Sequence, residues 1–355
     1  QYSGSANTTG NYNVAVGALS LDANTTASNN TAVGYQALTA NTTGANNVAI
    51  GYQALDAETA ASKNVAVGDS ALTAQNFSGG SDSYNVAVGC EAGAAITTGF
   101  YNTLIGGKAG DSLTDTDYNV AVGYNALATE TMGGYNTAVG CYALDAQNTT
   151  TATAIYNTAL GYSAGSDVTT GINNTLIGGD AGADITTGNY NTAVGYRAAD
   201  SVTTGTYNVA MGRRALDAVT TNSFNVAIGS SALESNTAAN NTAVGHNALN
   251  ANTTGTENTA VGKGALAANT TASGVTAVGE DALGANTTGA SNTAVGEGAL
   301  NSNTTADNNV AVGMAALAVN TTGANNVAVG TNALDANTTA ANNSAVGYGA
   351  LGGNT

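Results

Sequence analysis

The sequence predicts an all-β fold, a parallel β-solenoid of about twenty 17-residue coils, and two observations carry that prediction. A five-residue core, Asn-Val-Ala-Ile-Gly at 47–51, recurs with small changes in twenty places, and sixteen of the nineteen spacings between its glycines are 17 residues. Self-similarity at a short fixed period is typical of solenoids, which grow by adding coils. The chain has 47 glycines but no proline, so every backbone N–H is available to a continuous ladder. The strict period of the apolar positions also argues against a disordered tract.

The repeated core is interpreted as the first strand of each coil. We number every coil from its glycine, so that Asn47, Val48, Ala49 and Ile50 stand at positions −4 to −1 before Gly51 at position 0. Positions −3 and −1 lie on one side of a strand. They are mostly β-branched, and we expect them to point inward, with the small alanine at −2 facing out. The glycine is expected to make a turn that a Cβ would obstruct.

Asparagine stands at position −4 in nineteen of the twenty coils. In-register copies of one amide can stack, because each side chain bonds to its copies above and below. We therefore predict a structural asparagine ladder, which begins at Asn13, Asn30, Asn47, Asn64, Asn85 and Asn102.

A second inward strand is expected after the glycine, because position +4 is leucine in fifteen coils. The other five carry glycine or alanine there, and the same five have an aliphatic residue at +7: Ile96, Leu113, Val168, Ile185 and Val202. A lost core side chain would cost about 2–5 kcal/mol, so the exchange predicts that +7 fills the vacated space. Positions +4 and +7 have opposite parity, and we expect the strand to bend or bulge between them.

The chain is expected to form a single solenoid, 1–355, with three regions that differ in composition. Regular coils fill 1–72, tyrosine-rich coils with a 72-residue super-repeat fill 73–228, and regular coils with a 34-residue alternation fill 229–355. Two coils, starting at Gly68 and Gly140, have 21 residues. Their four extra residues fall near 75–82 and 147–155, and we expect loops that bulge from one face.

A column of aromatic residues at position −5 distinguishes the middle coils. It is a candidate surface-contact strip for sugar rings or a partner surface. A stacked ladder that stiffens the solenoid is the alternative, and it is favoured because in-register stacking alone explains the period. The strip consists of Tyr84, Tyr101, Tyr118, Tyr135, Tyr156, Tyr190 and Tyr207, followed by Phe224.

The repeated core resembles the head repeats of YadA-like trimeric autotransporter adhesins. Runs of Gly-Tyr-Gln-Ala-Leu at 34–38 and 51–55 also resemble repeats of phage tail-fibre proteins. The resemblance covers essentially the whole chain. It implies a left-handed parallel β-roll, commonly trimeric and exposed outside the cell. The 17-residue coils of this chain are longer than is usual in that family.

The residue pattern predicts no enzyme, no metal site and no cofactor. Catalysis needs unlike groups brought together, whereas a solenoid places like groups in rows. The one histidine, His246, stands where other coils have tyrosine or cysteine. Acidic residues at position +5, such as Asp22 and Asp145, are discontinuous along the stack. The Asp-containing nonapeptide of calcium-binding β-rolls is missing.

Cys90 and Cys141 occupy the same position three coils apart. At about 4.8 Å per coil they would lie about 14 Å apart, beyond the Cα separation of about 7 Å that a disulfide allows. We expect two free thiols, with a bridge between molecules as the alternative.

The formal net charge of −17 predicts no nucleic-acid partner and no attraction to anionic membranes. No run of 18 apolar residues occurs, so we expect no membrane insertion.

A row of Asn-x-Thr/Ser sequons marks candidate glycosylation sites in the last third: Asn252, Asn269, Asn286, Asn303, Asn320 and Asn337. Such sequons accept glycans in secreted proteins, although asparagine and threonine are also ordinary turn residues. Threonine columns leave ice binding as a minor alternative. The threonines are adjacent, as at Thr42 and Thr43, so neighbours on a strand would point in opposite directions.

These observations favour a non-enzymatic structural fibre, either a tail-fibre shaft or a surface filament segment. We expect it to be extracellular, at a cell surface or associated with a virion, and to self-associate as a homotrimer or an end-to-end filament. The alternative is an adhesin head that binds a host, matrix, glycan or protein receptor.

Overall fold

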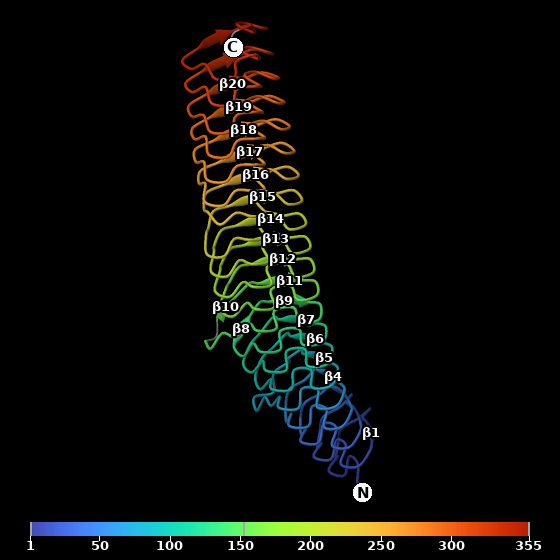
Figure 1. The fold of residues 1–355 in the computed structure, drawn as a ribbon. Coiled ribbons are helices and arrows are strands. Elements are labelled where there is room, and N and C mark those ends of the chain that lie inside the picture. Colours follow the sequence, from blue (N-terminus) through green and yellow to red (C-terminus); the bar gives the residue numbers. More distant parts are fainter. Residues whose placement is uncertain (1, 152, 354–355) are drawn as a thin grey trace. The chain divides into compact units, whose positions relative to one another are not determined.

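The computed structural model describes residues 2–151 and 153–353. Two compact units, Gln1–Gly179 and Asp180–Thr355, make up the chain. Each is a parallel β-solenoid, and together they hold twenty three-residue strands, one per coil, at the predicted spacing (Figure 1). No helix occurs in the described residues. The predicted all-β solenoid of about twenty coils is therefore confirmed, while the three-part division by composition stays a prediction.

Within each unit the strands share one register. Each strand pairs in parallel with the strand of the next coil of its unit, in most coils alanine opposite alanine, as at Ala32 and Ala49. Unit 1 contains β1 (Val14–Val16), β2 (Thr31–Val33), β3 (Val48–Ile50), β4 (Val65–Val67), β5 (Val86–Val88), β6 (Thr103–Ile105), β7 (Val120–Val122), β8 (Gly133–Gly134), β9 (Thr137–Val139), β10 (Thr153–Ala154), β11 (Thr158–Leu160) and β12 (Thr175–Ile177). Unit 2 contains β13 (Thr192–Val194), β14 (Val209–Met211), β15 (Val226–Ile228), β16 (Thr242–Val244), β17 (Thr259–Val261), β18 (Thr276–Val278), β19 (Thr293–Val295), β20 (Val310–Val312), β21 (Val327–Val329) and β22 (Ser344–Val346).

The expected orientation of the strands is wrong. The central alanine points inward and is completely buried, as at Ala49, whereas Val48 is half-buried and Ile50 is 38% exposed. Alternation fixes which residues share a face but does not say which face is inside. The interior is too narrow for two β-branched side chains per strand, and alanine fits it.

The expected second strand is also wrong, because the segment after the glycine is a series of turns. Leucine at +4 fills the interior from there with its backbone in the left-handed region, at φ 51–58° in all fifteen coils. That conformation costs a non-glycine residue about 1–2 kcal/mol. It persists because the side chain is buried, and because the N–H of Leu55 donates to Ala71 O in the next coil at 2.9 Å.

The exchange between +4 and +7 occurs without the expected bulge. Gly93 has φ 60°, close to that of the leucines it replaces, and Ile96 is buried as predicted. The vacated space is shared with Leu104, which takes the place of alanine at −2 in the following coil, the one that contains Gly110. A Cβ on Gly93 would lie 2.7 Å from Leu104 Cδ1, and one on Gly110 would lie 2.9 Å from its Cδ2. One leucine thus fills the gap left by two glycines in successive coils.

The glycine at position 0 behaves as predicted. Its φ lies between 125° and 144° along the whole column. A Cβ on Gly51 would overlap the carbonyl oxygen of Gly68 in the next coil. This position therefore excludes every other residue on two separate grounds, backbone strain and steric overlap.

The two 21-residue coils both lie in unit 1, and their extra residues form short pairings as well as loops. Ser62 pairs with Asp82 in an isolated bridge. In the second long coil, β10 pairs in parallel with β8, on one side of the ribbon in Figure 1.

We expect Leu104→Ala to destabilise its coils by about 2–5 kcal/mol, because it opens a cavity that faces two glycines. Ile105→Ala is the matched control, since the Ile105 side chain is 40% exposed and should cost about 1 kcal/mol or less. Stability in a solenoid is largely local, so amide hydrogen exchange over residues 86–125 is the measurement. Equal losses of protection in the two variants would contradict the packing described for Leu104.

Candidate binding surface

The asparagines at −4 link each coil to the next through side chain and backbone. The Asn30 Oδ1 accepts the backbone N–H of Asn47 at 2.9 Å, and Asn30 Nδ2 donates to Gly44 O at 2.9 Å. Direct amide-to-amide bonds, such as Asn64 Nδ2 to Asn47 Oδ1 at 3.2 Å, are secondary. Of the six predicted ladder residues, Asn13 is half-buried and the other five are buried: Asn30, Asn47, Asn64, Asn85 and Asn102.

A second asparagine ladder, at +7, was not expected, and it contains the predicted glycosylation row. Asn269 Nδ2 donates to Asn252 Oδ1 at 2.8 Å, and Asn252 Nδ2 donates to Gly255 O at 2.9 Å. All six sequon residues are 0% exposed: Asn252, Asn269, Asn286, Asn303, Asn320 and Asn337. A glycan on Nδ2 would replace a donor of this ladder inside a closed interior. The structure therefore speaks against the glycosylation hypothesis at these positions.

Two buried glutamates interrupt the +7 ladder, each in the coil before a 21-residue coil. Glu130 is 0% exposed, and its Oε1 accepts the backbone N–H groups of Thr131, Met132 and Gly133 at 2.7–3.0 Å. Its Oε2 accepts Gln147 Nε2 at 2.9 Å. Glu58 is buried in the same way 72 residues earlier, with Gln75 as its amide partner.

Each glutamate also holds the start of the inserted loop. Glu130 Oε1 accepts the N–H and Oγ1 of Thr149 at 3.1 and 2.8 Å, and Glu58 accepts the N–H of Phe77 at 3.4 Å. The sequence contains a signal for this role. Glu58 and Glu130 are acidic residues in a column, position +7, that otherwise holds amide or aliphatic residues, and each stands in the coil before an insertion.

The tyrosine column forms ladders that stack and remain exposed. In unit 1 the rings of Tyr101, Tyr118 and Tyr135 follow one another at 5.0 Å between centroids, with interplanar angles of 11° and 17°. Tyr84 and Tyr156 extend this ladder at its two ends, at 5.6 and 5.2 Å.

A shorter ladder lies in unit 2, where Tyr190 stacks on Tyr207 at 4.9 Å and Tyr207 on Phe224 at 5.4 Å. The seven predicted tyrosines are 43–55% exposed. Stacking and availability to a partner therefore coexist at this column.

A lysine closes one end of the unit 1 ladder. Lys63 Nζ lies 4.9 Å from the centroid of the Tyr84 ring, 2.7 Å from Asp82 Oδ2 and 2.8 Å from the Tyr84 hydroxyl. The hydrogen bond to Asp82 raises the pKa of Lys63 above its usual value. This trio shows how the coil surface holds an aliphatic cation.

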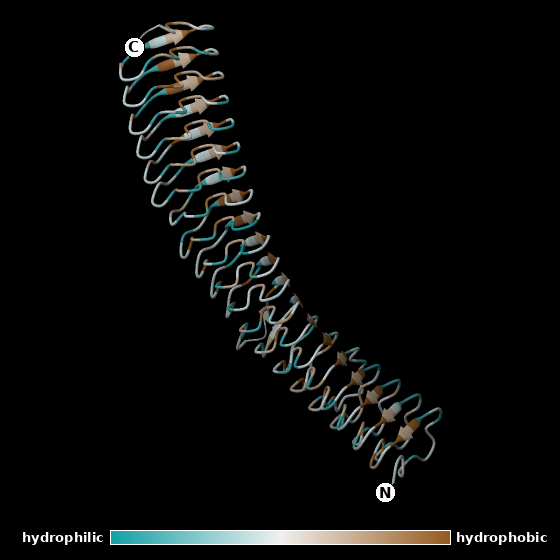
Figure 2. Cartoon of the chain, turned by 45° about the vertical axis from the view of Figure 1, so that its right-hand side comes forward, coloured by the Kyte–Doolittle hydropathy of each residue, from teal (hydrophilic) through white to brown (hydrophobic). Residues whose placement is uncertain are grey.

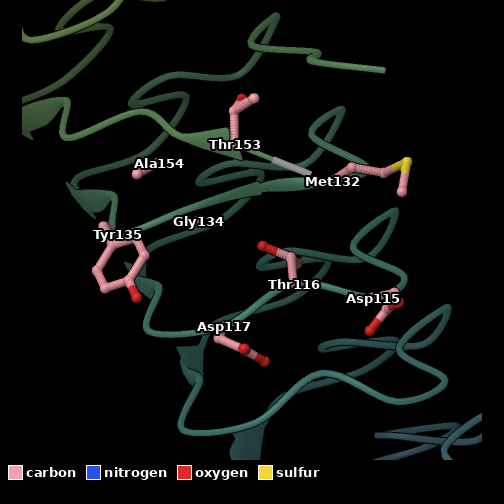
Figure 3. Close-up of a pocket in the computed structure, with 8 residues that line it drawn as sticks. All are labelled: Asp115, Thr116, Asp117, Met132, Gly134, Tyr135, Thr153 and Ala154. Carbon is pink, nitrogen blue, oxygen red and sulfur yellow. The ribbon is translucent and has the colours of Figure 1, made fainter. Parts of the chain in front are cut away.

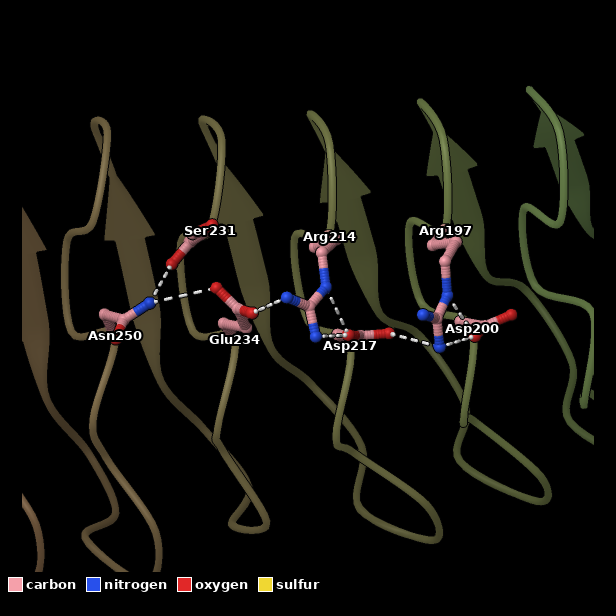
Figure 4. A network of polar contacts seen from close by, with 7 residues as sticks. All are labelled: Arg197, Asp200, Arg214, Asp217, Ser231, Glu234 and Asn250. Carbon is pink, nitrogen blue, oxygen red and sulfur yellow. Dashed lines mark hydrogen bonds and ion pairs between the residues drawn. The ribbon is translucent and has the colours of Figure 1, made fainter.

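The densest set of charged contacts belongs to unit 2 (Figure 4), where, among the described residues, only an ion pair, and no hydrogen bond, reaches the buried Oδ1 of Asp217. Arg197 pairs with Asp200 at 2.6 Å and lies 3.8 Å from Asp217 in the next coil. Arg214 pairs with Asp217 at 2.9 Å and with Glu234 at 2.6 Å. Each arginine pairs with an acid of its own coil and with one of the next coil, so this chain of ion pairs ties the coils together and engages both arginines.

A shallow pocket of about 180 Å³ opens beside the unit 1 ladder, next to β8 and to β10 of the inserted loop (Figure 3). Asp115, Thr116 and Asp117 come from one coil, and Met132, Gly134 and Tyr135 from the next. Thr153 and Ala154 of the inserted loop complete it. A Cβ on Gly134 would lie 2.8 Å from Asp117 O, so the missing side chain helps to keep the pocket open.

No family model and no curated protein matches this chain. The assignment of a site therefore rests on its own side chains.

The histidine and the two cysteines that the sequence singles out all lie at exposed positions. His246 Nδ1 lies 3.2 Å from Ser230 O at an exposed position. Cys90 and Cys141 are free and exposed, as expected for thiols three coils apart. Among the described residues, no group of three or more histidine, cysteine or acidic side chains could hold a metal ion. No described helix is long and apolar enough to cross a membrane.

We expect Glu130→Gln to open the second inserted loop, because an amide nitrogen would face donors that now converge on a carboxylate. An unsatisfied buried group costs about 1–3 kcal/mol. Limited proteolysis within 147–155 should therefore speed up by about five- to a hundredfold. Glu257→Gln, at an exposed position with the same charge change, is the control. If both variants are cleaved at the wild-type rate, Glu130 does not hold the loop.

Proposed function

We propose that this protein is a self-associating structural fibre, in which copies pack side by side through the strand face of the coils. The supporting observation is the outward direction of positions −3 and −1. Position −1 is aliphatic in every coil and −3 is valine, threonine or serine. Ile50, Ile105, Leu160 and Met211 at −1 are 38–48% exposed. No charged residue occurs in either column, although the chain carries a net charge of −17.

An isolated exposed aliphatic residue is ordinary on a protein surface. A charge-free column that continues from coil to coil is not, and contiguous apolar patches mark interaction surfaces. Figure 2 shows the hydrophobic brown of the strands recurring through each unit.

The repeat itself indicates which partner fits. The face repeats once per coil, at about the 4.8 Å spacing of paired strands. Only a surface with the same period stays in register with it over many coils, and a second copy of this chain has that period. Symmetric homo-oligomers are also the commonest soluble assemblies.

The resemblance to YadA-like head repeats and tail-fibre repeats supports the same proposal. It adds the expectations of a trimer and of a location outside the cell. An adhesin role is the second candidate, and the exposed tyrosine ladder beside a pocket favours it.

We expect Ile50→Asp to dissociate the assembly, because it places a charge within the buried interface. Thr43→Asp adds the same charge at an exposed position outside the strand face and should leave the assembly intact. Light scattering of the wild type should give a multiple of 34.4 kDa. Ile50→Asp should shift this toward a single chain, with far-UV circular dichroism unchanged. A wild type that stays monomeric at high micromolar concentration would overturn the proposal.

A further inference from the structure

The ladder at +7 lacks one donor in unit 1, between Asn41 and Glu58. Within this ladder each amide nitrogen donates to the oxygen of the member before it. Asn41 Nδ2 donates to Asn24 Oδ1 at 3.1 Å, and Gln75 Nε2 donates to Glu58 Oε2 at 3.1 Å. Asn41 Oδ1 is itself buried, and among the described residues it has no hydrogen-bond partner. Buried polar atoms are nearly always hydrogen-bonded, so this exception calls for an explanation.

Asn41 keeps the orientation of an ordinary ladder member. A Cβ on Gly44 would lie 2.6 Å from Asn41 Oδ1, and a Cβ on Gly255 would lie 2.5 Å from Asn252 Oδ1. The Oδ1 of Asn252 accepts the amide of the next coil at 2.8 Å. After Asn41 the corresponding position in the next coil is Glu58. An ionised glutamate has only acceptors, so it cannot supply the bond that Asn41 Oδ1 requires.

Glu58 is fully buried, and all its hydrogen-bond partners are uncharged. Its Oε1 accepts the N–H groups of Ala60 and Ala61 at 2.8 and 2.7 Å. Its Oε2 accepts the amide of Gln75, and the N–H of Phe77 lies 3.4 Å from both oxygens. The two short bonds from its own turn leave one oxygen with room for a proton.

The charged groups of the neighbouring segments have partners of their own. Asp56 accepts a threonine hydroxyl of the next coil at 2.9 Å. Lys63 pairs with Asp82 at 2.7 Å and donates to the Tyr84 hydroxyl at 2.8 Å. Burial of an ionised carboxyl group without a counter-charge is so costly that such groups take up a proton instead.

Glu130, 72 residues later, differs from Glu58 in both respects. The preceding member of its column is Leu113, which presents no acceptor. Its Oε1 accepts three N–H groups of its own turn as well as the N–H and the hydroxyl of Thr149. This set of donors suits a carboxylate and leaves no acceptor that a proton would serve.

We propose that Glu58 is held as a neutral carboxylic acid whose hydroxyl donates to Asn41 Oδ1, whereas Glu130 is a carboxylate. One proton then supplies the donor that the ladder lacks and removes a buried charge. It also makes the first inserted loop sensitive to pH, because Glu58 holds that loop through Phe77. A glutamate in an unfolded segment is ionised at neutral pH. Opening of this coil therefore releases a proton, and its stability falls as the pH rises.

Infrared spectroscopy of the full chain at neutral pH tests the protonation directly, since a carboxylic acid and a carboxylate absorb at different frequencies. The wild type should show the carbonyl band of a carboxylic acid. Glu58→Gln should remove this band, and the matched control Glu130→Gln should keep it. A wild type without the band, or a band that Glu58→Gln leaves unchanged, would overturn the proposal. The wild-type spectrum decides whether a neutral acid is present even if a variant folds poorly.

Limited proteolysis within 75–82 tests the pH dependence. The cleavage rate of the wild type, divided by that of Glu58→Gln at the same pH, should rise by up to about tenfold per pH unit above neutral. The division cancels the pH dependence of the protease. Cleavage within 147–155 is the internal control, and there the same ratio should stay constant. A constant ratio in the first loop as well would contradict the proton-dependent hold on it.

Discussion

The narrow interior of the coil is the constraint on which the rest of this structure depends. It accepts an alanine from the strand and one larger side chain from the opposite turn, as Ala49 and Leu55 show. A side chain larger than alanine on the strand requires a smaller residue at +4, and for this reason Leu104 occurs together with Gly93 and Gly110. So thin a core buries little apolar area per residue, while each ordered residue still costs about 1–2 kcal/mol of backbone entropy. The hydrogen bonds between coils therefore carry a large share of the stability.

Buried amides fix the register of the coils. An apolar interior this small would tolerate sliding, since alanine packs equally well against alanine one step away. The asparagines at −4 and +7 do not tolerate it, because a slip would leave buried donors and acceptors without partners. Val275 shows what the ladder requires: it replaces the asparagine at −4, yet its backbone N–H still donates to Asn258 Oδ1 at 3.0 Å. A single apolar substitution in the ladder therefore retains the hydrogen bond that the backbone donates to the preceding coil and loses only the bonds of the amide side chain.

The period, the parallel pairing and the glycine column could be predicted from the sequence, because each is a property of the repeat itself. The direction of the strand could not, since −3, −2 and −1 are all small or apolar and alternation leaves the inner face open. The left-handed backbone of Leu55 was equally inaccessible, because leucine rarely adopts it. The sequons illustrate a third limit. Asn252 is a glycan acceptor by its local sequence, and only the burial of its side chain inside the coil argues against glycosylation there.

Residues that repeat and residues that depart from the repeat have different roles in this chain. Every position shared by all coils is explained by stacking, and in the fibre that we propose the outward aliphatic columns would extend this packing to a second molecule. The departures concentrate in unit 1, where a buried glutamate, an inserted loop and a glycine at 134 occur together. In the first 72-residue copy Lys63 pairs with Asp82 and lies over the Tyr84 ring, and in the second Tyr135 takes the place of the lysine and packs on the Tyr156 ring. Because the scaffold beneath both copies is the same, a cation and a ring are interchangeable at this position of the coil surface.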